Sequence, residues 1–349
     1  MAVEDTESAV LTRVTGRAGY ITLNRPAALN ALTRPMVRAV ADALDRFEAD
    51  PGVAVVVLTG AGERGLCAGG DIRAIRADAL AGGRESFAFW RDEYRLNARI
   101  ARFGKPYAAV MDGIVMGGGV GVSAHGSVRI VTERSRVAMP ETGIGFVPDV
   151  GGTHLLARAP GETGTHLALT GLAVGAADAL LCGLADHFVD SGALPGLVAG
   201  LAGGEVAEVL GRYAATAPAG ELAGHREWID SCYAADTVEE IVGRLLAHGD
   251  PAAKEAAETV LTRSPTSLKV TLAALRRARV LGALEPVLEQ EYRVSCAVFT
   301  RPDLVEGVRA QVVEKDRAPR WSPGSLAEVT AAEVERCFAE APDGGLGLV

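Results

Sequence analysis

Several features are missing from this 349-residue sequence, and each absence argues against a class of protein. No apolar run approaches the roughly 20 residues that a helix needs to cross a bilayer, so no membrane span is expected. The five cysteines are scattered and form no CxxC pair, which argues against a disulfide framework and a zinc site. Basic residues are outnumbered, and the net charge of -9 argues against a general nucleic-acid binder.

The start of the chain also lacks a recognisable targeting signal. Residues 1–7 are acidic, without the basic and apolar regions of a secretory leader or the arginines of a mitochondrial presequence. We therefore expect a soluble, cytoplasmic protein. What the chain does have is a hydrophobic fraction of 48%, enough for a large folded core that forms one or two domains.

The first half of the sequence alternates between strand and helix patterns. Residues 53–58 form a nearly all-apolar, β-branched run, which is typical of a strand buried on both faces. Thr33 is the expected N-cap of a helix with Pro35 in its first turn. The alternation predicts an α/β fold with ligand sites beyond the strand ends. The expected strands are residues 18–23, 53–58, 107–111 and 128–132, and the expected helices are residues 34–49 and 85–103.

The second half of the sequence reads differently, because strand patterns disappear after about residue 190. Ser264 is expected to cap a helix that runs to about residue 280, and another helix is expected over residues 284–299. Asp303 is the predicted cap of a further helix to about Lys315. We therefore expect an α/β core over residues 1–190 and a helical region over residues 191–349.

A loop rich in proline and glycine, residues 139–152, carries the acids Glu141 and Asp149. Its two prolines and four glycines predict turns, which can bring both carboxylates into one pocket. Glycine-rich turns also occur upstream, at residues 67–71 and 116–121. Carboxylates together with exposed backbone N–H groups are the parts needed to attack a carbonyl and stabilise the resulting oxyanion.

These motifs resemble the crotonase superfamily, the enoyl-CoA hydratase/isomerase family. The segments that carry the resemblance are residues 21–26, 30–32, 67–72 and 112–121. The resemblance implies a spiral of repeated ββα units with parallel sheets, followed by a helical C-terminal region. It further implies that the backbone N–H groups of Gly70 and Gly118 form an oxyanion hole. The residues that it assigns to coenzyme A binding are Arg25, Leu66, Ala68, Asp71 and Ile72.

Further segments resemble the branch of this family that hydrolyses 3-hydroxyisobutyryl-CoA, namely residues 89–94, 111–121, 146–152, 264–269 and 306–310. The resemblance implies hydrolysis of a short 3-hydroxyacyl-CoA to the hydroxy acid and coenzyme A, as in valine breakdown, with no metal or redox cofactor. It places Glu93, Gly118, Glu141 and Asp149 at the substrate. Glu141 is the expected general base or nucleophile. Asp149 is expected to bind the substrate's 3-hydroxyl and to help place Glu141 or the water.

One departure from the family pattern argues against hydratase activity. Hydratases of this family use a second glutamate in the helix after the glycine turn, and Gly121 occupies that position here. Hydration or isomerisation of an enoyl-CoA is therefore not the main prediction but the first alternative. A non-catalytic acyl-CoA-binding protein is the second alternative. Glu93 as a solvated helix residue and Asp149 as a turn former also stay open. The resemblance leaves a homo-oligomer, trimer or hexamer, and a monomer as possible assemblies.

Overall fold

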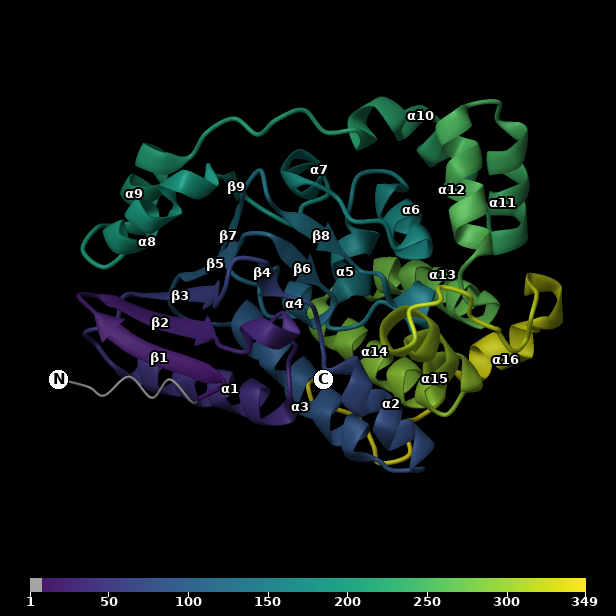
Figure 1. Cartoon of the computed structure of the whole chain (residues 1–349), viewed down its shortest axis with the longest axis horizontal. Coiled ribbons are helices and arrows are strands. Elements are labelled where there is room, and N and C mark those ends of the chain that lie inside the picture. The colour runs from purple at the N-terminus through teal and green to yellow at the C-terminus, as the bar shows by residue number, and fades with distance from the viewer. Residues whose placement is uncertain (1–7) are drawn as a thin grey trace. The chain divides into compact units, whose positions relative to one another are not determined.

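The computed structural model describes residues 8–349, so the acidic stretch 1–7 lies outside the described residues. The chain divides into two compact units, each assembled from separate segments (Figure 1). The first unit contains the chain up to residue 70 together with residues 95–137 and 174–220. The second unit contains residues 71–94, 138–173 and 221–349.

These units differ from the expected regions 1–190 and 191–349. Segments 71–94 and 138–173 group with the C-terminal helices, and segment 191–220 groups with the strands. The hydrophobic core explains why segment 191–220 groups with the strands, since Leu197 and Val209 pack in one cluster with the strand residues Val57 and Ile130. The expected absence of strands after about residue 190 agrees with the structure, in which the last strand is His187–Phe188.

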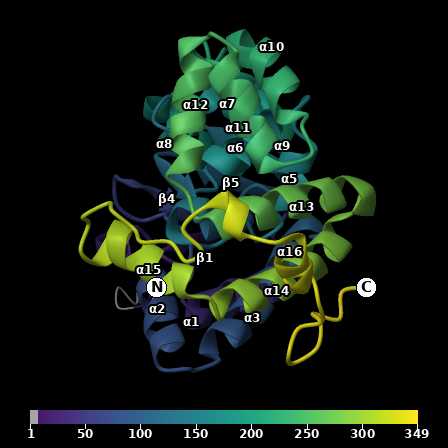
Figure 2. The same ribbon diagram turned by 90° about the vertical axis from the view of Figure 1, so that its right-hand side faces the viewer.

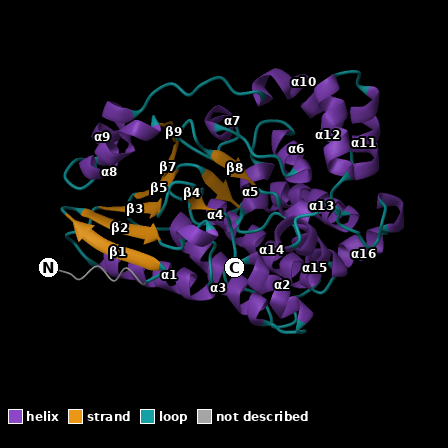
Figure 3. Ribbon diagram, viewed as in Figure 1, coloured by secondary structure: helices purple, strands orange, loops and turns teal. Residues whose placement is uncertain are grey.

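The first unit contains two sheets, drawn in orange in Figure 3. The larger sheet has the order β1-β2-β3-β5-β7-β9 and the smaller one the order β4-β6-β8. In the larger sheet, β1 pairs antiparallel with β2 and every later pairing is parallel, which gives the expected α/β class. The strands are β1 (Val10–Thr15), β2 (Ala18–Leu23), β3 (Val55–Gly60), β4 (Gly65–Cys67), β5 (Tyr107–Met111), β6 (Ile114–Met116), β7 (Val128–Val131), β8 (Arg136–Ala138) and β9 (His187–Phe188).

Four of the nine strands in the described residues, β2, β3, β5 and β7, lie where the sequence patterns predict them. The strand β2 has the predicted bounds, and β3 begins two residues later than the predicted strand 53–58. Thr33 caps α1 as expected, accepting the Met36 N–H at 3.5 Å. The strand β1, which is mostly exposed, was not predicted. The strands β4, β6, β8 and β9 were also missed, because segments of two or three residues show no periodicity. The helices of this unit are α1 (Arg34–Ala49), α4 (Gly118–Gly121), α7 (Ala176–Leu181), α8 (Leu194–Gly200) and α9 (Val206–Tyr213), and α3 (Glu85–Ala101) begins in the second unit.

The second unit is helical. Its helix α13 contacts α5, α6 and α14, and α11 and α12 lie side by side at the edge of the bundle (Figure 2). Ser264 caps α13 as predicted, because its Oγ accepts the Ser267 N–H at 3.1 Å. The helices are α2 (Ile72–Leu80), α5 (Gly152–Ala157), α6 (Thr163–Thr170), α10 (Leu222–Tyr233), α11 (Val238–Ala247), α12 (Pro251–Leu261), α13 (Pro265–Leu281), α14 (Leu284–Phe299), α15 (Pro302–Val308) and α16 (Ala331–Arg336).

The prediction that Asp303 caps a helix is wrong. Arg301 is the N-cap of α15, so Asp303 lies within the first turn of the helix. The buried Asp303 carboxylate instead accepts the Ser264 hydroxyl at 2.6 Å and the Ser322 N–H at 2.7 Å. Tertiary contacts of this kind are not visible in a local sequence pattern. The helix also ends earlier than predicted, continuing from α15 as a π-helix only to Val313.

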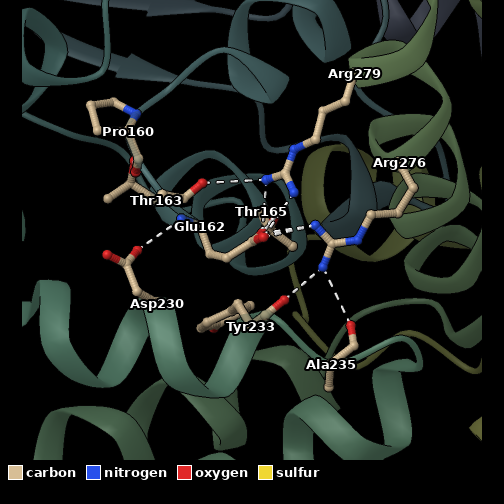
Figure 4. Close-up of polar contacts among 10 residues, drawn as sticks. Pro160, Glu162, Thr163, Thr165, Asp230, Tyr233, Ala235, Arg276 and Arg279 are labelled. Carbon is tan, nitrogen blue, oxygen red and sulfur yellow. Dashed lines mark hydrogen bonds and ion pairs between the residues drawn. The ribbon is translucent and has the colours of Figure 1, made fainter.

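An ion-pair network connects three helices of the second unit (Figure 4). Glu162, the N-cap residue of α6, is paired with Arg276 and Arg279 of α13 at 2.9 and 2.8 Å. Its backbone N–H donates to the Asp230 carboxylate of α10 at 2.8 Å. Arg276 also donates to the carbonyl oxygen of Tyr233 at 2.7 Å. These contacts fix the start of α6 against α10 and α13.

Candidate active site

The two glycine-rich turns lie against each other in the first unit. Gly69 has a φ of +106° and Gly117 a φ of +50°, conformations that side chains other than glycine rarely adopt. A Cβ atom added to Gly69 would lie 3.2 Å from the Met116 carbonyl oxygen and 3.5 Å from the Gly118 nitrogen. The structure therefore brings the turn before Gly70 into contact with the turn at Gly118.

The predicted oxyanion donors are the amides of Gly70 and Gly118. Gly118 is the first residue of α4, where an amide has no partner within its own helix. Among the backbone hydrogen bonds of residues 8–349, neither amide is a donor. The neighbouring Gly119 packs tightly, since a Cβ atom there would lie 2.4 Å from the carbonyl oxygen of Cys67. The turns thus have N–H groups available for a ligand, and their function as an oxyanion hole stays a prediction.

The residues predicted to bind coenzyme A have mixed surroundings. The side chain of Leu66 is 1% exposed and belongs to the core of the first unit. Arg25 donates from its guanidinium to a nearby backbone carbonyl at 2.6 Å. In the second unit, Asp71 caps α2 and Ile72 is the first residue of that helix. Ala68 is partly exposed. Coenzyme A binding by these residues stays a prediction.

The predicted acids are all buried in the second unit. Glu141 begins a single 3-10 turn, Glu141–Ile144, in the loop where turns were predicted. Asp149 lies just before α5, and Glu93 lies on α3. Glu141 and Asp149 are each 6% exposed and Glu93 is 1% exposed, so Glu93 is not a solvated helix residue. Fully buried carboxylates are rare unless they are paired, which marks this group as unusual.

The electrostatics of these acids show that they are close enough to interact. Burial raises the pKa of Glu141 well above its ordinary value, and the negative charge of Asp149 raises it further. The same two causes, in the same order, raise the pKa of Glu93. Burial raises the pKa of Asp149 to about 7, although a hydrogen bond from Tyr94 acts in the opposite direction. Such shifts are typical of catalytic acids and bases.

Two oxygen atoms of this group have no partner. Among the buried side-chain atoms of residues 8–349, Oε1 of Glu93 and Oε2 of Glu141 make no hydrogen bond. Buried polar atoms are normally satisfied, so unsatisfied ones at a group of coupled acids indicate a place for a polar ligand or water. The site can therefore accept or donate protons at both glutamates.

Asp149 is held by a chain of hydroxyl groups that the sequence did not reveal. The Tyr94 hydroxyl donates to Oδ2 of Asp149 at 2.6 Å and also lies 2.7 Å from the Ser295 Oγ. Tyr94 comes from α3 and Ser295 from α14, and both side chains are buried. Next to them, the rings of Trp90 and Phe146 stack with centroids 5.2 Å apart.

Glu291 of α14 holds the turn that follows Asp149. Its carboxylate accepts the N–H groups of Gly151 at 2.6 Å and Thr153 at 2.9 Å, and the Thr153 hydroxyl at 2.6 Å. The turn needs support, because Val150 has a φ of +54°, a strained conformation for a β-branched residue. Burial raises the pKa of Glu291 to about 8, against the lowering effect of these hydrogen bonds.

Sequence reasoning missed Glu291 and Ser295, and it did not assign a function to Tyr94. The available signal was the pattern of α14, in which Glu291 and Ser295 are four residues apart and therefore share one helix face. Polar residues that are buried on a helix indicate specific hydrogen-bond partners. The sequence alone does not show that those partners lie in the loop at residues 149–153.

A separate cavity of about 680 Å³ lies elsewhere in the second unit and contains none of the predicted site residues. The cavity is lined by Arg276, Arg277, Val280, Leu281, Pro286, Glu289, Gln290, Arg293, Phe338 and Val349.

Among the described residues, no group of three or more His, Cys, Asp or Glu side chains could hold a metal ion. No helix within residues 8–349 is long and apolar enough to span a bilayer.

Comparison with known proteins gives matches over nearly the whole chain. The profile of the enoyl-CoA hydratase/isomerase family matches residues 18–338. The chain is 42% identical over 345 residues to a Gallus gallus protein named 3-hydroxyisobutyryl-CoA hydrolase, mitochondrial, covering 96% of this chain and 89% of that protein. A Rattus norvegicus protein of the same name is 44% identical over 345 residues, covering 95% of this chain and 89% of the relative.

Solved structures also match. A structure described as a carnitinyl-CoA dehydratase from Mycobacterium thermoresistibile is 53% identical with a TM-score of 0.94, and the match covers 97% of this chain and 98% of that one. A structure described as an enoyl-CoA hydratase from Rhodobacter sphaeroides 2.4.1 is 44% identical with a TM-score of 0.91, covering 97% of this chain and 99% of that one.

Proposed function

We propose, from the premise that this chain belongs to the enoyl-CoA hydratase/isomerase family, that it hydrolyses a short 3-hydroxyacyl-CoA thioester. The expected substrate is 3-hydroxyisobutyryl-CoA, which the names of the Gallus and Rattus relatives specify. The observation that carries the proposal is the buried Glu141, whose Oε2 has no partner and whose pKa is raised by burial and by the neighbouring Asp149. The predicted products are 3-hydroxyisobutyrate and coenzyme A, as in valine breakdown.

In the proposed reaction, a carboxylate activates attack on the thioester carbon. As general base, Glu141 takes a proton from water while the water oxygen bonds to that carbon, and collapse of the oxyanion breaks the C–S bond. As nucleophile, Glu141 itself bonds to the carbon, the C–S bond breaks, and water then hydrolyses the anhydride. Repeated turnover in ¹⁸O-labelled water distinguishes them, because only the anhydride route puts label into the Glu141 carboxylate.

The other parts of the proposal concern the oxyanion and the substrate hydroxyl. The amides of Gly70 and Gly118 are proposed to donate hydrogen bonds to the oxyanion. Losing one such donor typically reduces the rate by a factor of roughly 10²–10³. Asp149 is proposed to bind the 3-hydroxyl, and Glu93 to contact the substrate through its unpartnered Oε1. A carboxyl group that can both donate and accept is suited to a hydroxyl ligand.

The second candidate function is hydration or dehydration. It is favoured by the descriptions of the two solved structures, a carnitinyl-CoA dehydratase and an enoyl-CoA hydratase. Against it, α4 has Gly121 where hydratases of the family place their second glutamate, and its first turn contains no acid. Without that acid, one of the two proton-transfer groups for adding water to a double bond is missing.

A panel of acyl-CoA substrates tests the proposal. Release of free thiol from 3-hydroxyisobutyryl-CoA, measured with a thiol-reactive dye, is the expected result. Loss of enoyl absorbance from crotonyl-CoA without thiol release would instead identify a hydratase. Binding of these compounds by calorimetry without any turnover would identify a non-catalytic acyl-CoA-binding protein.

The remaining expectations are proposals of the same kind. The reaction consumes only water besides the acyl-CoA, so activity is expected to survive dialysis against a chelator. A cytoplasmic location stays a prediction, to be checked by cell fractionation, and the names of the vertebrate relatives specify mitochondria instead. Light scattering of the purified protein distinguishes a monomer from a trimer or hexamer.

A further inference from the structure

We propose that Tyr94 and Ser295 are positioning residues for Asp149, forming a relay of hydroxyl groups that fixes this carboxyl group for the reaction. The inference rests on the proposed function, because it assumes that Asp149 acts on the substrate. It adds two residues to the site, and it gives the helix α14 a part in positioning the site. The geometry that carries it lies entirely within the second unit.

The relay has a defined direction. Tyr94 donates its only hydroxyl proton to Oδ2 of Asp149 at 2.6 Å. The Tyr94 oxygen can then only accept at its other contact, so the Ser295 hydroxyl donates to it at 2.7 Å. The order is therefore Ser295 to Tyr94 to Asp149. With Oδ2 occupied in this way, we expect the substrate or water to approach Asp149 at Oδ1.

Burial makes these hydrogen bonds strong and specific. Tyr94 and Ser295 are each 0% exposed, so water does not compete for either hydroxyl. A hydroxyl that donates to an ionised carboxylate forms a short, charge-assisted bond. The Tyr94 ring is held in place edge-on to the ring of Tyr292, with centroids 6.3 Å apart. Each member of the relay therefore has little freedom to move.

The relay acts on the protonation of Asp149 as well as on its position. Burial raises the pKa of this carboxyl, and the Tyr94 hydrogen bond is the leading influence that lowers it. Removing the Tyr94 hydroxyl is therefore expected to raise the pKa of Asp149 further. If Asp149 works as a carboxylate, the acidic limb of the pH–rate profile then moves to higher pH.

The structure offers a matched control for removing one buried tyrosine hydroxyl. Tyr292 is as deeply buried as Tyr94 and lies beside it, but its hydroxyl donates to the Asp343 carboxylate at 3.0 Å. Tyr292→Phe thus removes the same atom from the same neighbourhood without touching Asp149. Thermal unfolding of each variant checks that the fold is intact.

The experiment compares wild type, Tyr94→Phe, Ser295→Ala and Tyr292→Phe in thiol release from 3-hydroxyisobutyryl-CoA between pH 5 and 9. For Tyr94→Phe we expect kcat/KM to fall roughly 10- to 100-fold, the usual range for a hydrogen bond to a charged group. We expect the acidic limb of its pH–rate profile to move to higher pH by about one unit. Ser295→Ala should shift the limb less, in the same direction, and Tyr292→Phe should not shift it. An unmoved limb in Tyr94→Phe, or an equal shift in Tyr292→Phe, overturns the proposal.

A second measurement does not depend on activity. With ¹³C-labelled aspartate, NMR follows the titration of the Asp149 carboxyl, whose signal is assigned by its loss in Asp149→Asn. The expected result is a higher apparent pKa in Tyr94→Phe than in wild type and an unchanged one in Tyr292→Phe. If the wild type hydrolyses no substrate, the proposed function fails, whereas an equal titration in wild type and Tyr94→Phe overturns the relay itself.

Discussion

Two groups of acidic side chains in the second unit are both largely shielded from solvent and behave in opposite ways. Glu162 has 12% of its side chain exposed and is paired with Arg276 and Arg279 (Figure 4). Burial by itself would raise its pKa, but the hydrogen bonds from Arg279, Thr165 and Arg276 lower it below the ordinary value. Glu141 is 6% exposed, and its pKa is raised well above the ordinary value.

The difference lies in the neighbours. In the described residues, no arginine or lysine is among the main groups that shift the pKa of Glu93, Glu141, Asp149 or Glu291. The negative charge of Asp149 raises the pKa of Glu93, Glu141 and Glu291, so the members of this group cannot all be ionised near neutral pH. A buried acid with cationic partners stabilises the fold as a fixed charge. A buried acid among other acids can exchange a proton, which is what acid–base chemistry needs.

The largest expected effect comes from removing that proton-exchanging ability at Glu141. Glu141→Gln keeps the size of the side chain and should reduce kcat of thiol release by roughly 10²–10⁴, the usual contribution of a general acid or base. Glu162→Gln is the control, because it makes the same substitution at a largely shielded carboxylate of the paired group, and its kcat should equal that of wild type. Equal losses in the two variants would contradict the distinction between the groups.

Some features of the fold and of the candidate site could be predicted from the sequence, and others required the structure. The strands β2, β3, β5 and β7, the turns at Gly70 and Gly118, and the loop that carries Glu141 and Asp149 were predictable, because local glycine, proline and periodic patterns indicate them. The burial of Glu93 was not predictable, since a helix residue shows its exposed or buried face only once its partners are known.

The unpredicted part of the site consists of contacts between distant segments. Ser295 and Tyr94 are 201 residues apart in sequence, and Glu291 and Gly151 are 140 apart. No local pattern encodes such pairings, because they depend on how α14 packs in the second unit. The candidate catalytic residues were therefore easier to predict than the residues that hold them in place.

A smaller effect on turnover is expected from Asp149, together with a change in pH dependence. Asp149→Asn removes a carboxyl whose pKa is about 7 and should lower kcat/KM by roughly 10- to 100-fold, the range for a hydrogen bond to a charged group. The acidic limb near pH 7 should disappear from its pH–rate profile. The measurement is thiol release from pH 5 to 9. A variant with wild-type KM and wild-type hydrolysis would show that Asp149 has no part in binding the hydroxyl.

The same carboxyls should make stability depend on pH in a particular direction. The pKa of Asp149 rises from 3.8 to about 7 and that of Glu291 from 4.5 to about 8, so the folded state binds more protons between these values than the unfolded state. The stabilisation is present below the unfolded pKa values and is lost as the pH rises through about 7 and 8.

Urea unfolding at pH 5, 7 and 9 measures this loss. The free energy of unfolding of the wild type should fall by a few kcal/mol over this range, since one pKa unit corresponds to about 1.4 kcal/mol. In Asp149→Asn the fall should be smaller, because one of the shifted groups is gone. A wild type whose stability rises with pH over the range would mean that these acids are ionised in the folded protein.

The smallest effect on activity, and a purely structural one, is expected from the ion-pair network. Glu162→Gln leaves Arg276 and Arg279 without their carboxylate, and we expect it to cost about 1–3 kcal/mol of unfolding free energy, more than the ~0.3–0.5 kcal/mol of an exposed helical pair. The exposed pair Lys254–Glu258 in α12, with side chains 67% and 63% exposed, supplies the matched variant Glu258→Gln.

The pH dependence of this stability cost has the opposite sign to that expected for Asp149 and Glu291. Because the pKa of Glu162 is lowered in the folded state, its stabilisation is present above the unfolded pKa and is lost as the pH falls through the folded one. The difference in unfolding free energy between wild type and Glu162→Gln should therefore be full at pH 7 and shrink toward pH 3. If it instead grew as the pH fell, Glu162 would belong with the proton-exchanging acids, and cationic partners would not be what separates the two groups.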